Sequence, residues 1–298
     1  MHTKRVVVVG TGDLLQKEVT SLLSKHFALT NIILNESLYI HQGAPVSNNF
    51  LIHHGDVLVD LTHNKELKRQ LEHEMPIVSP YMYQGIHSTP GRKLAWKKHL
   101  MESSARPDLN TPHIIYIKSP GVEDDFLMSQ YKKTLLPVVI HGEGVYPRTP
   151  IYSFHEFCDE LNGVLGRDGY AYIEHYIPGD LVHLISIRDF RDEPIYTSPL
   201  ISKGKTGEYS SVKHLTHEKR KKIEHHVKNL HHELGLGPLS KFDIVIGNKS
   251  VHLVDIDANP SLRKNDVVES SLKTVGANMG EFWKQVVENA RREFKSRK

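Results

Sequence analysis

Polar side chains that share one orientation occur near the end of the chain, on two apolar segments that a turn joins. The segments read FDIVI and VHLVDI, with the turn-forming GNKS between them. Asp255, Asp257 and Asn259 follow one another at intervals of two, so in an extended strand they point to the same face. Oxygen ligands of this kind suit Mg²⁺. Asp257 and Asn259 therefore form a candidate metal site, to which Asp243 of the first segment could add a carboxylate.

The alternative is an exposed hairpin whose polar face is simply hydrated. Two carboxylates ~4 Å apart repel each other by about 4 kcal/mol at an effective dielectric near 20, and a divalent cation reverses that sign. The pairing register also matters. A two-residue turn at Asn248 and Lys249 places Asp243 on the opposite face from Asp257, whereas a three- or five-residue loop places both on one face.

Composition limits the classes of function. The chain has 298 residues, enough for two or three lobes, and a formal net charge of +3 that is too small to indicate nucleic-acid binding. Cys158 is the only cysteine, which excludes disulfide scaffolds and thiolate metal clusters and is typical of the cytoplasm. No apolar run approaches 18 residues, so we expect no membrane role. The basic residues of 217–232 are interpreted as the solvated face of an amphipathic helix, and most histidines as surface residues.

The N-terminal third predicts alternating strands and helices. RVVVV (residues 5–9) reads as a buried parallel strand, Gly10-Thr11-Gly12 as a turn, and residues 16–27 as an amphipathic helix. A dinucleotide-binding fingerprint would need a third glycine where Leu15 stands, so that reading is rejected. The glycine turn is instead interpreted as a helix N-terminus at which a substrate carboxylate could bind.

The remaining segments predict two further lobes. A proline- and glycine-containing stretch places a boundary near residue 90, and Ser153 and Glu156 form a capping box at the start of a helix. Three segments between residues 170 and 201 read as an antiparallel meander, and Cys158 as a core residue. The predicted division is residues 1–90, 91–178 and 179–298.

This order of elements resembles the ATP-grasp superfamily, and within it the D-alanine–D-alanine ligases. Asp243 and the run Asp257-Ala258-Asn259-Pro260 match the acid and the Glu-x-Asn of that family, and residues 173–179 (IEHYIPG) match its hinge segment. The resemblance covers nearly the whole chain. It implies a mixed α/β and α+β fold, in which an N-terminal α/β (pre-ATP-grasp) domain precedes a two-lobed ATP-grasp domain. It also implies ATP between the lobes and Mg²⁺ or Mn²⁺ on Asp243, Asp257 and Asn259.

The resemblance implies further roles. Glu174, Tyr176 and Ile177 would border the adenine, and Lys97 would contact phosphate. Glu18 would hold the ammonium group of the first substrate, and Ser271 would face a substrate carboxylate. A loop at 202–210 would close over ATP, with either Lys203 or Lys205 contacting phosphate.

The sequence departs from the family pattern at several positions. His141 stands where the family has a lysine over the phosphates, so it would contact phosphate as a titratable cation. A glycine-containing loop from Gly142 to Pro147 replaces the family's serine-rich loop. Backbone N–H groups at Gly142 and Gly144 could still cradle phosphate. Leu181 replaces the ribose-binding acid, with Asp180 beside it, and Asp257 is shorter than the usual glutamate.

The expected function is therefore an ATP-dependent carboxylate–amine ligase that works through an acyl phosphate. D-alanine is the first expectation for both substrates, which would place the protein in peptidoglycan precursor synthesis in the cytoplasm. The alternatives are a ligase for another amino acid or peptide, and an ATP-binding protein without ligase activity. The expected partners are small amino acids rather than nucleic acid or membranes, together with a second copy of the chain, because similar ligases are often dimers.

Overall fold

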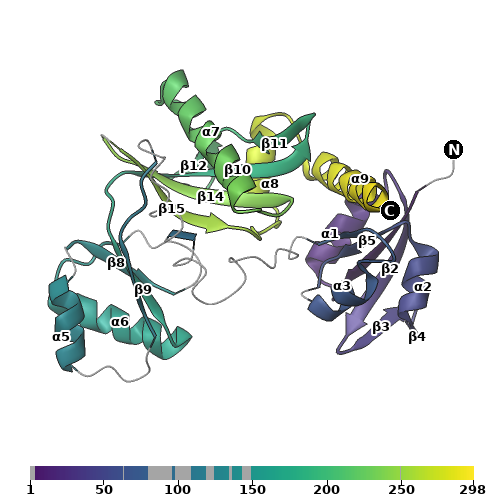
Figure 1. Ribbon diagram of the computed structural model, residues 1–298, viewed down its shortest axis with the longest axis horizontal. Coiled ribbons are helices and arrows are strands. Elements are labelled where there is room, and N and C mark those ends of the chain that lie inside the picture. The colour runs from purple at the N-terminus through teal and green to yellow at the C-terminus, as the bar shows by residue number, and fades with distance from the viewer. Residues whose placement is uncertain are drawn as a thin grey trace.

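The described residues of the chain form three β-sheets in the computed structural model (Figure 1). The structure describes residues 4–62, 64–79, 96–97, 109–118, 124–133, 136–142, 149–248 and 250–298. Strands and helices are mixed throughout, as the predicted α/β and α+β class requires. Among the described residues, no helix has the length and apolar character needed to cross a membrane.

The N-terminal sheet has the strand order β4-β3-β2-β1-β5-β6. Its strands are β1 (Arg5–Gly10), β2 (Ala28–Asn35), β3 (Leu38–His41), β4 (Ala44–Val46), β5 (Val57–Asp60) and β6 (Ile77–Val78). Helices α1 (Leu14–Leu23), α2 (Asn48–His54) and α3 (Lys65–Leu71) connect them. The valines of β1 are buried, and β1 pairs in parallel with β2 and β5, which confirms the predicted α/β opening. The antiparallel β3 and β4 were not expected from the sequence.

A small antiparallel sheet forms the central part, with the order β7-β9-β8. Its elements are β7 (Ile114–Ile117), α5 (Asp124–Lys133), β8 (Val138–His141), α6 (Phe154–Asp168) and β9 (Ala171–His175). The predicted capping box is present at the start of α6, where Ser153 and Glu156 each cap the other. Cys158 is partly buried against the core of this sheet, in agreement with its interpretation as a core residue.

The third sheet has the order β13-β12-β10-β14-β15, and β11 also pairs with β10. Its strands are β10 (Asp180–Phe190), β11 (Glu193–Thr197), β12 (Ile201–Lys203), β13 (Tyr209–Ser211), β14 (Leu239–Ile246) and β15 (Val251–Asp257). One strand predicted at 195–201 is in fact two, because Pro199 cannot donate a ladder hydrogen bond. Ser198 compensates at this break, where its hydroxyl accepts the N–H of Ile185 at 3.1 Å.

Helices cover this third sheet on both faces. They are α7 (His217–Glu233), α8 (Val267–Thr274) and α9 (Met279–Arg297). The predicted apolar stripe of α7 is confirmed, since Ile223, Val227 and Leu230 are buried. The expectation that most histidines lie at the surface is wrong for His231, which is buried. Its Nδ1 lies 2.6 Å from the Ser186 hydroxyl, and burial lowers its pKa to about 4.

A β-bulge decides the register of the β14–β15 hairpin. Gly247 N–H donates to the Ser250 carbonyl at 2.9 Å and closes the turn, next to the paired residues Ile246 and Val251. Continued without interruption, this register would place the side chains of Asp243 and Asp257 on opposite faces of the sheet. The register shifts between Asp243 and Ile244, because Val254 is an extra residue in β15. Asp243 consequently pairs with Asp255, and all three acids face the same side of the sheet.

Two features join the sheets to one another. Trp96 is buried in the core between α7 and the third sheet, while the next side chain, Lys97, contacts Glu174 of the central sheet. On the opposite side, α9 lies between the third sheet and the N-terminal sheet (Figure 1), and Trp283 belongs to a core that includes residues of both. The boundary predicted near residue 90 lies outside the described residues, and the three-domain division stays a prediction.

Trp283 provides a test of this shared core. The side chain is 1% exposed, and its indole N–H has no hydrogen-bond partner within the described part of the chain. We expect Trp283→Ala to lower the free energy of unfolding by about 3–5 kcal/mol, measured by urea denaturation. Trp283→Phe keeps a large ring and removes the unpaired N–H, so it should cost clearly less; equal losses in both variants would contradict the packing.

Candidate functional site

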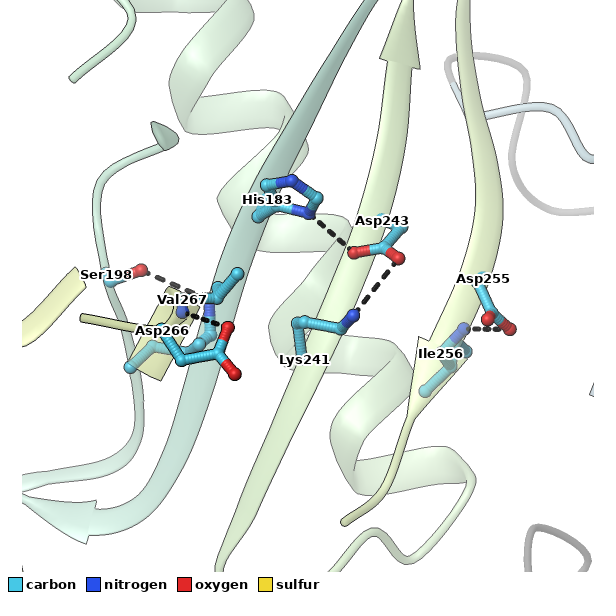
Figure 2. Close-up of polar contacts among 9 residues, drawn as sticks. His183, Ser198, Lys241, Asp243, Asp255, Ile256, Asp266 and Val267 are labelled. Atoms are coloured by element: carbon cyan, nitrogen blue, oxygen red, sulfur yellow. Dashed lines mark hydrogen bonds and ion pairs between the residues drawn. The ribbon is translucent and has the colours of Figure 1, made fainter. Parts of the chain in front are cut away.

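Both carboxylate oxygens of Asp243 contact basic side chains at the centre of the third sheet. His183 of β10 pairs in register with Asp243 of β14, and its Nδ1–H donates to Oδ1 at 2.7 Å. Lys241, two residues earlier on the same strand face, places Nζ 3.2 Å from Oδ2. Figure 2 shows Asp243 between these two side chains, with Asp255 on the neighbouring strand. Burial alone would raise the pKa of this carboxyl group, but the contacts with His183 and Lys241 outweigh it and lower the pKa.

Lys241 is the positive centre of the acidic face. It pairs across the strands with Asp257, and its side chain is 16% exposed. Burial alone would lower the pKa of Lys241, but the carboxylates of Asp243, Asp257 and Asp255 together raise it. The ammonium group thus lies within the field of all three acids.

The predicted metal ligands come together only in part. Asp243 and Asp257 share a face, and Asp257 Oδ1 accepts the backbone N–H of Asn259 at 3.0 Å, which orients this carboxylate. Among the described residues there is no cluster of three or more histidine, cysteine or acidic side chains arranged for a metal. The oxygen donors of Asp243, Asp257 and Asn259 nevertheless suit Mg²⁺ or Mn²⁺, which needs only one or two protein carboxylates when phosphate oxygens complete the shell.

A pocket of about 360 Å³ lies at the hinge between the central and third sheets. It is lined by Tyr176, Ile177, Gly179, Asp180, Leu181, Val182, Ser202, Lys203, His214 and Val245. Gly179 has a φ of 155°, and a Cβ there would collide with the Ile246 carbonyl oxygen, so the hinge needs glycine. Five predicted contact positions, including Leu181 in place of the family acid, therefore line one pocket, and Lys203 rather than Lys205 reaches it.

The pocket and the acidic face lie on the same side of the third sheet. Leu181 and Val245 form part of the pocket wall, and His183 and Asp243 are the next residues on that face of β10 and β14. Two residues along a strand correspond to roughly 6–7 Å. A ligand with an apolar ring in the pocket could thus extend its polar end toward Asp243 and Lys241.

A second buried ion group lies in the central part of the chain. Lys97 Nζ forms an ion pair with Glu174 Oε2, and His141 Nε2 lies 3.0 Å from Glu174 Oε1. Lys97 and Glu174 are fully buried and His141 is 6% exposed. The structure therefore brings these three predicted nucleotide-contact residues together, but the Glu174 side chain points to basic groups instead of lining the hinge pocket.

The other predicted residues are not gathered at this site. Glu18 lies half-buried on α1, and Ser271 is fully buried in α8, where its hydroxyl has no hydrogen-bond partner within the described part of the chain. Lys205 is exposed, in the turn between β12 and β13 that replaces part of the predicted loop. Gly142 is buried next to His141, and Gly144 lies outside the described residues.

Sequence reasoning missed three titratable residues. His183 is the one ionisable residue in the apolar run LVHLISI, and Lys241 precedes Asp243 by two; both could have been assigned by strand alternation. Asp60 ends the buried strand β5 at the carboxyl edge of the N-terminal sheet, where ligands of α/β folds bind. Its Oδ1 accepts the N–H of Thr62 at 2.8 Å and the hydroxyl of Thr62 at 2.6 Å, and burial raises its pKa to about 6.

Comparison of the structure with solved proteins finds the same fold in bacterial ligases. The chain superposes on D-alanyl-alanine synthetase A of Vibrio cholerae with a TM-score of 0.69 and 10% identity, covering 98% of this chain and 99% of that one. A D-alanine–D-alanine ligase of Bacillus anthracis, solved with ATP, gives 0.68 at 16% identity and covers 98% and 99%. A D-Ala:D-Ser ligase of Enterococcus faecalis gives 0.68 at 14% identity and covers 97% and 100%.

Sequence comparison alone finds no such relationship: no protein-family model and no curated protein sequence matches the chain. The structural likeness extends over almost the full length of both partners. The chain therefore has the fold of the D-alanine–D-alanine ligases, which confirms the resemblance inferred from its motifs at the level of fold.

The buried ion group can be tested by removing its acid. Glu174→Ala leaves the ammonium of Lys97 buried without its carboxylate, and we expect the free energy of unfolding to fall by about 3–5 kcal/mol. The double variant Lys97→Met with Glu174→Leu removes both charges and should lose less than the single variant. Urea denaturation of the three proteins gives the comparison, and a double variant less stable than the single one would contradict it.

Asp60 predicts a pH dependence of stability. Its folded pKa of about 6 lies above the ordinary value of 3.8, so its protonated form favours the folded state. This contribution is present below about pH 4 and is lost as pH rises through about 6; the shift corresponds to about 3 kcal/mol. Asp60→Asn should therefore gain stability relative to wild type between pH 4 and 7 in urea denaturation. Asp159→Asn, at an exposed acid, should run parallel to wild type; a parallel curve for Asp60→Asn would refute the assignment.

Proposed function

We propose that the protein is an ATP-dependent carboxylate–amine ligase. The observation that carries the proposal is the hinge pocket beside the acidic face: Tyr176, Ile177, Leu181 and Val245 would border the adenine, and Asp243 and Asp257 lie further along the same side of the sheet. The fold of the ligases it superposes on, one of them solved with ATP, supports the same assignment.

The reaction needs positioned charge more than a protein nucleophile. One substrate carboxylate would attack the γ-phosphorus of ATP, forming an acyl phosphate and releasing ADP. The amine of the second substrate would then attack the acyl carbon, lose a proton and release phosphate, leaving an amide. Lys203 at the pocket, with Lys97 and His141 of the central part, would stabilise the negative charge of the phosphates.

A divalent ion would belong to the acidic face. Asp243, Asp257 and Asn259 would hold Mg²⁺ or Mn²⁺, which supplies positive charge to the phosphate oxygens during transfer. Lys97 would have to exchange Glu174 for phosphate. The β12–β13 hairpin carries Lys203 at the edge of the pocket, and its closure would keep water from the acyl phosphate.

D-alanine is the proposed substrate for both positions, which would place the product in peptidoglycan precursor synthesis in the cytoplasm. A ligase that accepts another amino acid as the second substrate is the alternative. It is favoured by the equally good superposition on the D-Ala:D-Ser ligase. Both versions of the proposal use small amino acids as partners, and a homodimer is proposed for either.

The proposal predicts ADP release that depends on Mg²⁺ and on an amino acid. We expect the purified protein to release ADP with D-alanine and to form a dipeptide detectable by mass spectrometry. ADP release with D-serine or another amino acid alone would support the alternative. Nucleotide binding without any ADP release, across a panel of amino acids, would contradict ligase activity.

Asp257→Ala removes one proposed metal ligand and should lower the rate of ADP release by at least about 100-fold, while circular dichroism stays unchanged. Asp159→Ala, at an exposed acid on α6, is the matched control and should keep the wild-type rate. A wild-type rate of ADP release by Asp257→Ala would show that Asp257 is not a metal ligand.

A further inference from the structure

The ammonium group of Lys241 lies where a divalent ion shared by Asp243 and Asp257 would have to bind. Its Nζ is 3.2 Å from Asp243 Oδ2, and its residue pairs in register with Asp257. The Lys241 side chain is 16% exposed, so little water screens it from these carboxylates. A buried ammonium and a metal ion at this short distance from one carboxylate repel each other strongly.

The remaining groups on this face do not remove the conflict. His183 donates to the other oxygen of Asp243, so one of the two lone-pair directions of Oδ1 is already occupied. Asp255 accepts the N–H of Ile256 at 2.9 Å and adds a third negative charge to the face. The ammonium group of Lys241 therefore interacts with the carboxylates of all three acids.

We propose that Lys241 is a built-in cation that competes with the divalent metal ion for Asp243 and Asp257. Without nucleotide, the ammonium offsets part of the negative charge of the acidic face and thereby lowers its affinity for a metal ion. ATP phosphates would supply the additional negative charge that lets both cations remain, so metal and nucleotide bind together. This last step rests on the proposed function, whereas the competition itself depends only on the contacts of Lys241.

Metal binding without nucleotide tests the competition directly. Mn²⁺ is titrated into the full-length protein, and the free ion is followed by electron paramagnetic resonance. We expect Lys241→Met to bind Mn²⁺ about tenfold or more tightly than wild type, because one positive charge beside the ion is removed. Lys241→Arg keeps the charge and should stay close to wild type.

Controls separate charge competition from a general effect. Lys222→Met removes a charge from the exposed face of α7 and should leave Mn²⁺ binding unchanged. Adding Asp243→Asn to Lys241→Met should abolish the gain, because the ion then loses one of its two carboxylates. Should Lys241→Met fail to fold, as judged by circular dichroism, Lys241→Gln undergoes the same titration.

Unchanged or weaker Mn²⁺ binding in the neutral variants, or an equal gain in Lys241→Arg, would overturn the inference. The titration involves no turnover, so it stands apart from the ligase proposal. Wild-type protein that releases ADP with D-alanine while Lys241→Met shows no gain in Mn²⁺ affinity would refute the competition alone. A gain in affinity in a protein that never releases ADP would refute the ligase proposal alone.

Discussion

The extra residue at Val254 determines which side chains share the functional face of the third sheet. Side chains alternate along a strand, so a change of one residue moves every later side chain to the other face. Leu253 and Ile256 both pack in the core beneath α7 although they are three residues apart, because the bulge lies between them. Without it, Asp255 and Asp257 would face that apolar core, where unpaired carboxylates are costly.

In the described part of the chain, two separate groups of buried charged side chains are compensated locally. Lys97, Glu174 and His141 form one group in the central part, and His183, Asp243 and Lys241 form the other on the third sheet. Each group combines one buried carboxylate with a lysine and a histidine, which lowers the cost of keeping charge out of water. Both groups contain residues that the proposed reaction would use to bind phosphate or metal. Ligand binding would therefore have to replace ion pairs that already exist in the unliganded protein.

The departures from the ligase pattern acquire physical meaning in this setting. His141 contacts the same carboxylate as Lys97. The histidine that replaces the lysine of the family pattern is therefore part of a shared ion group, not an isolated phosphate contact. Leu181 packs with Val245 at the hinge, which makes that wall of the pocket more apolar than an acid would. The fold common to the similar structures thus persists at 10–16% identity.

The sequence by itself determined the order and type of most elements. Local patterns that depend only on neighbouring residues can be recognised in the sequence without the fold. They include the apolar periodicity of β1, α7 and the β14–β15 hairpin, and the capping box of α6. The spacing of Asp257 and Asn259, with the hinge motif, was sufficient to indicate the ligase fold. The broken strand at Pro199 and the β3–β4 extension were missed, because short strands depend on their partners more than on their own residues.

Only the tertiary structure decided which charged groups meet. His183 and Asp243 are 60 positions apart, and Lys97 and Glu174 are 77 apart, so no local pattern couples them. The register of β14 with β15 depends on a bulge that is invisible in the alternation of the segments taken separately. Lys241 looks like an ordinary polar residue of a strand in the sequence, and it becomes the cation of the acidic face only because pairing across strands places three carboxylates around it.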